Sequence, residues 1–137
     1  MQNILNIKEK LEEQAKNEYS VANAKLLREQ EKLEALMLRW EEAKQRLKQI
    51  LHDVLSMREI KMREEAAEIL KFYVRQQRLA VKRSEKEVEV AREKLSEAMK
   101  ERKIFEKLRE RAYEEFLREE NRREQREVDE LISYKHR

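Results

Sequence analysis

The chain has 137 residues and a net charge of +3, and it contains no glycine, no proline and no cysteine. Average usage predicts about sixteen glycines and prolines together in this length, so the residues that most often end helices are missing, and the absent cysteine excludes disulfides and thiolate metal sites. With 46% charged and 39% hydrophobic residues, the chain lacks the apolar surface for a wide core but has enough for the narrow seam of an all-α coiled coil.

The first predicted helix covers about residues 3–54. Its apolar residues recur at alternating steps of three and four, which is the spacing of a coiled-coil seam, and Glu29 is the one polar gap. This first register consists of Ala15, Tyr19, Ala22, Leu26, Leu33, Leu36, Trp40, Ala43, Leu47, Ile50, Val54 and Met57.

The first register fails after Met57, where it would place Lys61 and Glu64 in the seam. A second register takes over at Ile60, offset by one residue, which on a continuous helix would rotate the apolar stripe by about 100°. It consists of Ile60, Ala67, Leu70, Val74, Gln77, Val81, Ser84, Val88, Ala91, Leu95, Ala98, Phe105, Ala112 and Phe116, with Arg63, Arg102 and Arg109 at its polar positions.

The offset predicts a chain reversal between Asp53 and Met62, with a turn at about 55–60 and a second helix over about 60–134. Ser56 and Glu59 have the spacing of a capping box, which would let Ser56 start the second helix. The alternative is one continuous helix of about 200 Å that dimerises along its length.

Folding back at this turn predicts one domain over 1–137, a long antiparallel two-helix coiled coil or helical hairpin. If Trp40 faces Gln77 and Leu5 faces Ala112, the C-terminal helix overhangs the first by about 20 residues, or roughly 30 Å. Residues 118–127 of this overhang are entirely polar. An isolated helix of this length is marginal in water, so either it frays or a partner holds it.

Catalytic or metal-binding chemistry is not predicted. His52 and His136 have no neighbours at metal-ligand spacing, and a helix pair offers no cleft in which catalytic groups converge. No apolar run approaches the roughly 18 residues that span a bilayer. We therefore expect no catalytic, cofactor-binding or metal-binding residues, no cofactor, and no membrane insertion.

Several apolar residues lie outside both registers, and Phe72 and Leu79 among them repeat at seven residues on one face. They indicate either a wider seam or a docking patch for another protein. A basic stretch over 75–86, opposed only by Glu85, is typical of a solvated helix face, with phosphate contact as the alternative. The residues outside the registers are Leu38, Leu51, Leu55, Met62, Phe72, Tyr73 and Leu79.

The segment 101–130 resembles the flagellar export protein FliJ family. The resemblance extends to residues 4–19, which look like the first helix of the family, and to residues 76–79, which look like its early second helix. It is carried by the block Glu106, Lys107 and Leu108, the aromatic Phe116, and the closing run Arg123, Glu124, Gln125, Asp129 and Glu130.

This resemblance implies a non-enzymatic component of the flagellar type III export apparatus, similar in fold to the stalk of rotary ATPases. Implied partners are the hexameric export ATPase FliI, the export gate protein FlhA and export chaperones, with no nucleic acid. The implied location is cytoplasmic, peripheral at the plasma membrane, and the implied function is mechanical coupling of ATPase ring and gate.

The resemblance also implies two sets of protein-binding residues. The ring-end candidates are Phe116, Arg122, Arg123, Gln125, Asp129 and Glu130. The gate-side candidates are Leu70, Phe72, Tyr73, Gln77 and Leu79. Leu70 and Gln77 also belong to the second register, where a structural role competes with a binding role.

Three other functions remain open from the sequence. A generic scaffold or interaction protein would be a dimeric coiled coil. A related stalk would serve a virulence type III secretion system. A nucleic-acid binder would use the basic stretch over 75–86, with binding that weakens steeply as salt rises.

Overall fold

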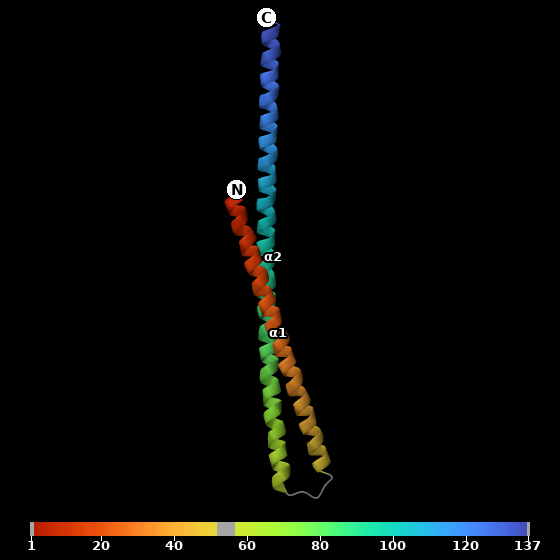
Figure 1. Cartoon of the computed structure of the whole chain (residues 1–137). Helices are drawn as coiled ribbons and strands as arrows, with labels where there is room; N and C mark the ends of the chain where they lie inside the picture. The colour runs from red at the N-terminus through yellow and green to blue at the C-terminus, as the bar shows by residue number, and fades with distance from the viewer. Residues whose placement is uncertain (1, 52–56, 137) are drawn as a thin grey trace. The chain divides into compact units, whose positions relative to one another are not determined.

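A computed structural model describes residues 2–51 and 57–136 of the chain, and these residues form two long helices without any strand. Helix α1 is Gln2–Ile50 and helix α2 is Met57–Lys135 (Figure 1). The two helices are antiparallel and pack against each other, which confirms the prediction of an all-α helical hairpin. The alternative of one continuous helix is therefore wrong.

The ends of the helices at the reversal differ from the expected boundaries. Helix α1 ends at Ile50, and α2 begins at Met57 with the acidic Glu59 in its first turn. A carboxylate there is favourable because the N-terminal end of a helix carries partial positive charge. The expected Ser56 cap, together with Asp53 and Val54, lies outside the described residues.

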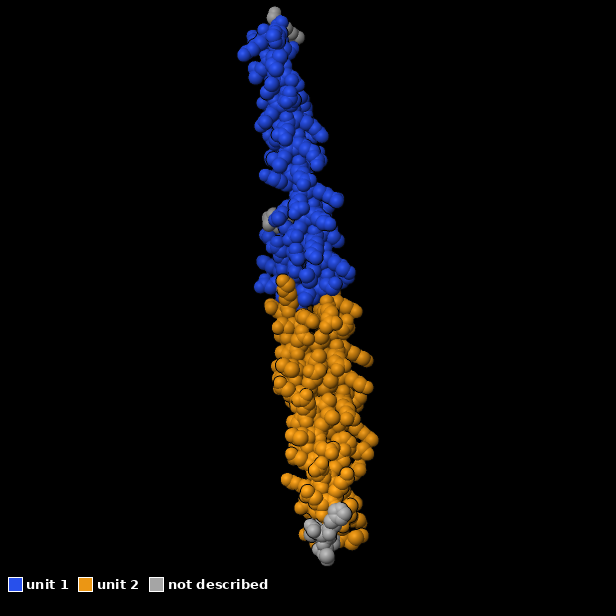
Figure 2. Space-filling view, turned by 90° about the vertical axis from the view of Figure 1, so that its right-hand side faces the viewer, with its two compact units in different colours: residues 1–15, 95–137 blue, residues 16–94 orange. Residues whose placement is uncertain are grey.

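The chain divides into two compact units, and each helix contributes to both (Figure 2). Unit 1 combines residues 1–15 with 95–137, and unit 2 consists of residues 16–94. The prediction of a single domain over 1–137 stays a prediction.

In unit 2, both predicted registers line the interface between the helices, except for Met57. This residue lies on α2 and is 78% exposed, so its place in the first register is wrong. On α2, Val74 and Ser84 are each 1% exposed, and on α1 the seam residues from Tyr19 to Leu47 are half-buried. This arrangement confirms the one-residue offset between the registers as the signature of two helix faces that meet. The other buried residues of this interface are Ile50, Ala67, Val81, Val88 and Ala91.

In unit 1, the seam of α1 continues toward the N-terminus through polar residues. Leu5 is fully buried and Glu12 is buried, with Lys8 half-buried between them. Across from them, α2 contributes Leu95, Ala98, Arg102 and Phe105, all half-buried. The sequence pattern missed Lys8 and Glu12 as seam residues because the apolar periodicity records only apolar side chains.

The predicted pairing of the two helices is wrong by about one heptad. Gln77 lies opposite Glu29, with its Nε2 2.9 Å from the Glu29 carbonyl oxygen, and not opposite Trp40. Lys8 lies opposite Glu101, with 2.7 Å between Nζ and Oε2, whereas the prediction put Leu5 opposite Ala112. Sliding one helix by seven residues restores the same apolar seam, so the periodicity cannot choose between such pairings.

The overhang of α2 in unit 1 is confirmed, and it is longer than the expected 20 or so residues. Over 107–136 every residue is exposed except the half-buried Glu120. Ala112 and Phe116, which the second register placed in the seam, are exposed, so this part of the prediction is wrong. The stripe continues in the sequence, but α1 begins at Gln2 and provides no mate for it (Figure 1).

The burial pattern predicts that the same substitution lowers stability on one face of α2 and leaves it nearly unchanged on the other. Val74→Ala removes the two buried methyl groups of the valine and should lower the free energy of unfolding by about 1–2 kcal/mol. Val90 is 53% exposed, so Val90→Ala should leave stability within about 0.5 kcal/mol. Urea unfolding followed by circular dichroism measures both changes, and equal destabilisation would contradict the assigned faces.

Candidate protein-interaction surfaces

The described residues offer surfaces on helices rather than an enclosed site. They contain no group of three or more His, Cys, Asp or Glu side chains that could hold a metal ion. Within the same part of the chain, no helix is long and apolar enough to cross a membrane. Open grooves lie between the two helices and are lined by side chains of both, and a further shallow groove is lined by side chains of α2 alone.

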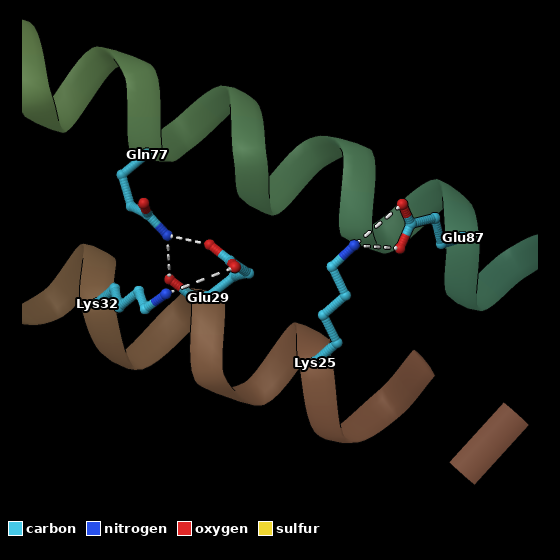
Figure 3. A network of polar contacts seen from close by, with 5 residues as sticks. All are labelled: Lys25, Glu29, Lys32, Gln77 and Glu87. Atoms are coloured by element: carbon cyan, nitrogen blue, oxygen red, sulfur yellow. Dashed lines mark hydrogen bonds and ion pairs between the residues drawn. The ribbon is translucent and has the colours of Figure 1, made fainter. Parts of the chain in front are cut away.

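Gln77, a gate-side candidate, is engaged inside unit 2 (Figure 3). Its amide nitrogen donates to the backbone carbonyl and to the carboxylate of Glu29, and Lys32 lies 3.9 Å from the other carboxylate oxygen. Nearby, Lys25 Nζ lies 3.0 Å from Glu87 Oε2 across the two helices. These polar contacts satisfy Gln77 in the seam, so its side chain holds the helix pairing.

The other gate-side candidates divide into exposed and seam residues. Phe72 is 56% exposed and Leu79 is 51% exposed, so both point away from the seam. Tyr73 is exposed beside Phe72, with 5.9 Å between ring centroids in an edge-on arrangement. Leu70 is half-buried and belongs to the seam. The structure therefore presents Phe72, Tyr73 and Leu79 at the surface of unit 2, and not Leu70 or Gln77.

Leu79 also lines a groove of unit 2 that combines apolar and cationic side chains. Leu33 and Val81 contribute the other apolar atoms, and Arg75, Arg78 and Lys82 surround them together with Glu85. The basic stretch noted in the sequence thus lies next to exposed apolar surface. An apolar surface flanked by cations suits a protein partner that carries acidic groups better than it suits a ligand that makes only ionic contacts.

All six ring-end candidates lie on the exposed part of α2 in unit 1. Four of them contact neighbours about one turn away on the same helix, and these are Arg122, Arg123, Gln125 and Asp129. Arg122 pairs with Glu119 at 2.9 Å, and Gln125 donates to Asp129 at 3.3 Å. Arg123 lies 3.8 Å from both Glu120 and Glu127.

These pairs leave the ring-end side chains available to a partner. Exposed ion pairs within a helix contribute at most about 0.5 kcal/mol each, so a protein that offers matching charges can replace them at low cost. Phe116 and Leu117 are exposed on the same segment. The last turns add further exposed apolar residues, which are Val128, Leu131, Ile132 and Tyr134.

The exposed segment begins directly after a polar cluster that the sequence analysis did not identify. Glu12 is buried on α1 and accepts a hydrogen bond from Arg102, which also lies 3.0 Å from Glu106. The hydrogen bonds that Arg102 donates to Glu12, and then to Glu106, raise the pKa of Arg102, so Arg102 is cationic at any physiological pH. The available signal was a pair of opposite charges, Glu12 and Arg102, at seam positions of the two helices.

Comparison with known proteins identifies the family of the chain. The family model described as Flagellar FliJ protein matches residues 1–137, the whole chain. Neither the curated proteins nor the solved structures contain a significant match.

Proposed function

Because the chain belongs to the FliJ family, whose members are components of the flagellar type III export apparatus, we propose that it couples the export ATPase FliI to the export gate protein FlhA. In this proposal it is a stalk-like coiled coil without enzymatic activity. It acts in the cytoplasm, at the cytoplasmic face of the plasma membrane, during flagellum assembly.

The observation that carries this proposal is the unpaired part of α2 in unit 1. Over 110–136 every residue is exposed except the half-buried Glu120, yet helices in proteins gain most of their stability from packing against other elements. A hexameric ring that surrounds this segment would supply the missing contacts on several sides at once. Exposed arginines and glutamates around the helix suit a ring lined with alternating charges.

The proposed gate contact uses Phe72, Tyr73 and Leu79 in unit 2. Large apolar side chains that are exposed in the free protein and become buried in a complex supply most of the binding free energy at interfaces. The neighbouring cations of the basic stretch would orient the partner and increase the association rate.

Coupling in this proposal depends on the continuity of α2. Both candidate surfaces lie on this helix, which extends without a break from Met57 to Lys135. No glycine or proline interrupts it. A movement of its ring-end segment would therefore be transmitted along the hydrogen-bonded backbone of the helix. Helix α1 braces α2 through the seam in each unit.

The first prediction from this proposal concerns the ring end. Of the described residues, a deletion of 118–137 removes only exposed ones and one half-buried glutamate, so unfolding of the remaining seam should be nearly unchanged. Affinity for the organism's own FliI hexamer should fall at least about tenfold, because the segment that enters the ring is missing. Unchanged affinity of the truncated chain would remove the stalk-like role.

A charge reversal tests the ring-end contacts without removing the helix segment that carries them. Arg122→Glu with Arg123→Glu should weaken FliI binding more at low salt than at high salt, because salt screens exposed charges. The matched control is Arg75→Glu with Arg78→Glu, which changes the net charge equally on unit 2. If the control weakens ring binding as much, the effect is long-range charge and not ring-end contact.

The second prediction concerns the gate contact. Phe72→Ala with Leu79→Ala should reduce affinity for FlhA at least about tenfold while the unfolding midpoint changes little, since both side chains are exposed. Leu70→Ala with Gln77→Ala has the same seven-residue spacing but alters the seam, so it should lower the unfolding midpoint instead. Calorimetric titration with FlhA and thermal unfolding measure the two effects. A lower unfolding midpoint with unchanged FlhA affinity for the Phe72 and Leu79 variant would contradict the proposed surface.

A further inference from the structure

A second groove in unit 2 lies between the end of α1 and the beginning of α2. Its α1 side is formed by Arg39, Glu42, Ala43 and Arg46, and its α2 side by Arg63, Ala66 and Leu70. The two alanines provide only methyl groups where larger side chains would close the space. They leave a hollow of about 250 Å³ with an apolar floor.

Three arginines surround this floor, and none of them is paired with an acidic side chain in the part of the chain that the structure describes. Arg39, Arg46 and Arg63 form no ion pair or hydrogen bond with any described residue. Elsewhere in the described chain, Arg92, Arg118, Arg122 and Arg123 each pair with a glutamate of the same helix.

Glu42 is the one acidic residue in the lining, and it precedes Arg46 by one helical turn. It forms no ion pair with the arginines among the described residues. The groove therefore carries an excess of two positive charges.

We propose that this groove binds an acidic amphipathic helix of a partner protein. The carboxylates of that helix bind the guanidinium groups of Arg39, Arg46 and Arg63, because the planar guanidinium matches a carboxylate with two parallel hydrogen bonds. One apolar side chain of the partner packs on Ala43, Ala66 and Leu70. This site is separate from the ring-end surface, and it does not rest on FliI or FlhA as partners.

The groove suits this ligand better than other anions. Its volume of about 250 Å³ is below the about 300–1,000 Å³ typical of small-molecule sites. No aromatic residue lines it, whereas single-stranded nucleic acid is bound by stacking of bases on aromatic rings. A phosphate ion would use the arginines but would leave the apolar floor uncovered. A peptide with both carboxylates and an apolar side chain uses the whole groove.

The test uses the full chain and a synthetic probe. The probe is a fluorescein-labelled helical peptide of 18 or so residues with glutamates flanking leucines at heptad spacing, without aromatic residues. A second peptide has lysine in place of every glutamate. Fluorescence anisotropy should show saturable binding of the acidic peptide and none of the basic one. Absence of saturable binding by the acidic peptide would overturn the proposal.

Matched variants locate the binding. Arg39→Gln, Arg46→Gln and Arg63→Gln together should reduce affinity at least about tenfold. The control combines Arg28→Gln, Arg58→Gln and Arg83→Gln, which removes the same charge from exposed positions of unit 2 outside the groove, and it should change affinity less than about twofold. Equal losses would show that the peptide binds net charge, and would overturn the assignment to the groove.

Filling the hollow tests its apolar floor without changing any charge. Ala66 is exposed, so Ala66→Leu should leave the unfolding midpoint unchanged while it blocks the seat of the apolar side chain and weakens peptide binding. Trp40, the one tryptophan of the chain, precedes Ala43 by one turn and should change its emission when the wild-type groove is occupied. Full affinity of the Ala66→Leu variant would contradict docking in the groove.

Discussion

Pairing between α1 and α2 is the constraint on which the rest of the structure depends. A helix as charged as α2 has little packing energy of its own, so its stability comes from the seam that it shares with α1. Toward the C-terminus of α2, that seam stops near Leu5 and Phe105, next to the first turn of α1, which begins at Gln2. The residues of α2 beyond this point are exposed because α2 is longer than α1. This exposed segment is the one proposed to enter the ATPase ring.

The sequence predicted the two faces of the hairpin but not how they align. Each register is an apolar pattern with a period of seven, and it identifies the buried face from Ala15 to Ile50 and from Ile60 to Phe105. Alignment depends on polar partners instead, such as Gln77 with Glu29 and Glu12 with Arg102. Such pairs can specify the register of a coiled coil. The partners in such pairs can be identified only once the two helices are placed side by side.

The exposure of some candidate residues could also be predicted from the sequence. Phe72 and Leu79 fall outside the second register, and both are exposed, so they do not widen the seam. Their role as a docking patch stays a prediction. Ala112 and Phe116 were misplaced because a seam pattern continues in sequence after its mate has ended. The arginine-lined groove could not be predicted at all, since it requires Arg46 of α1 and Arg63 of α2 to line the same groove.

Hydrogen exchange of the free protein tests the central claim most directly, because it reports the local stability of each amide. If the seam stabilises α2, amides over 74–105 should exchange slowly. Amides over 110–134 should exchange at least about a hundredfold faster, although both segments belong to one helix. Equal protection on the two sides of Phe105 would contradict the account, because it would mean that the end of α2 is stable without α1 and without a partner.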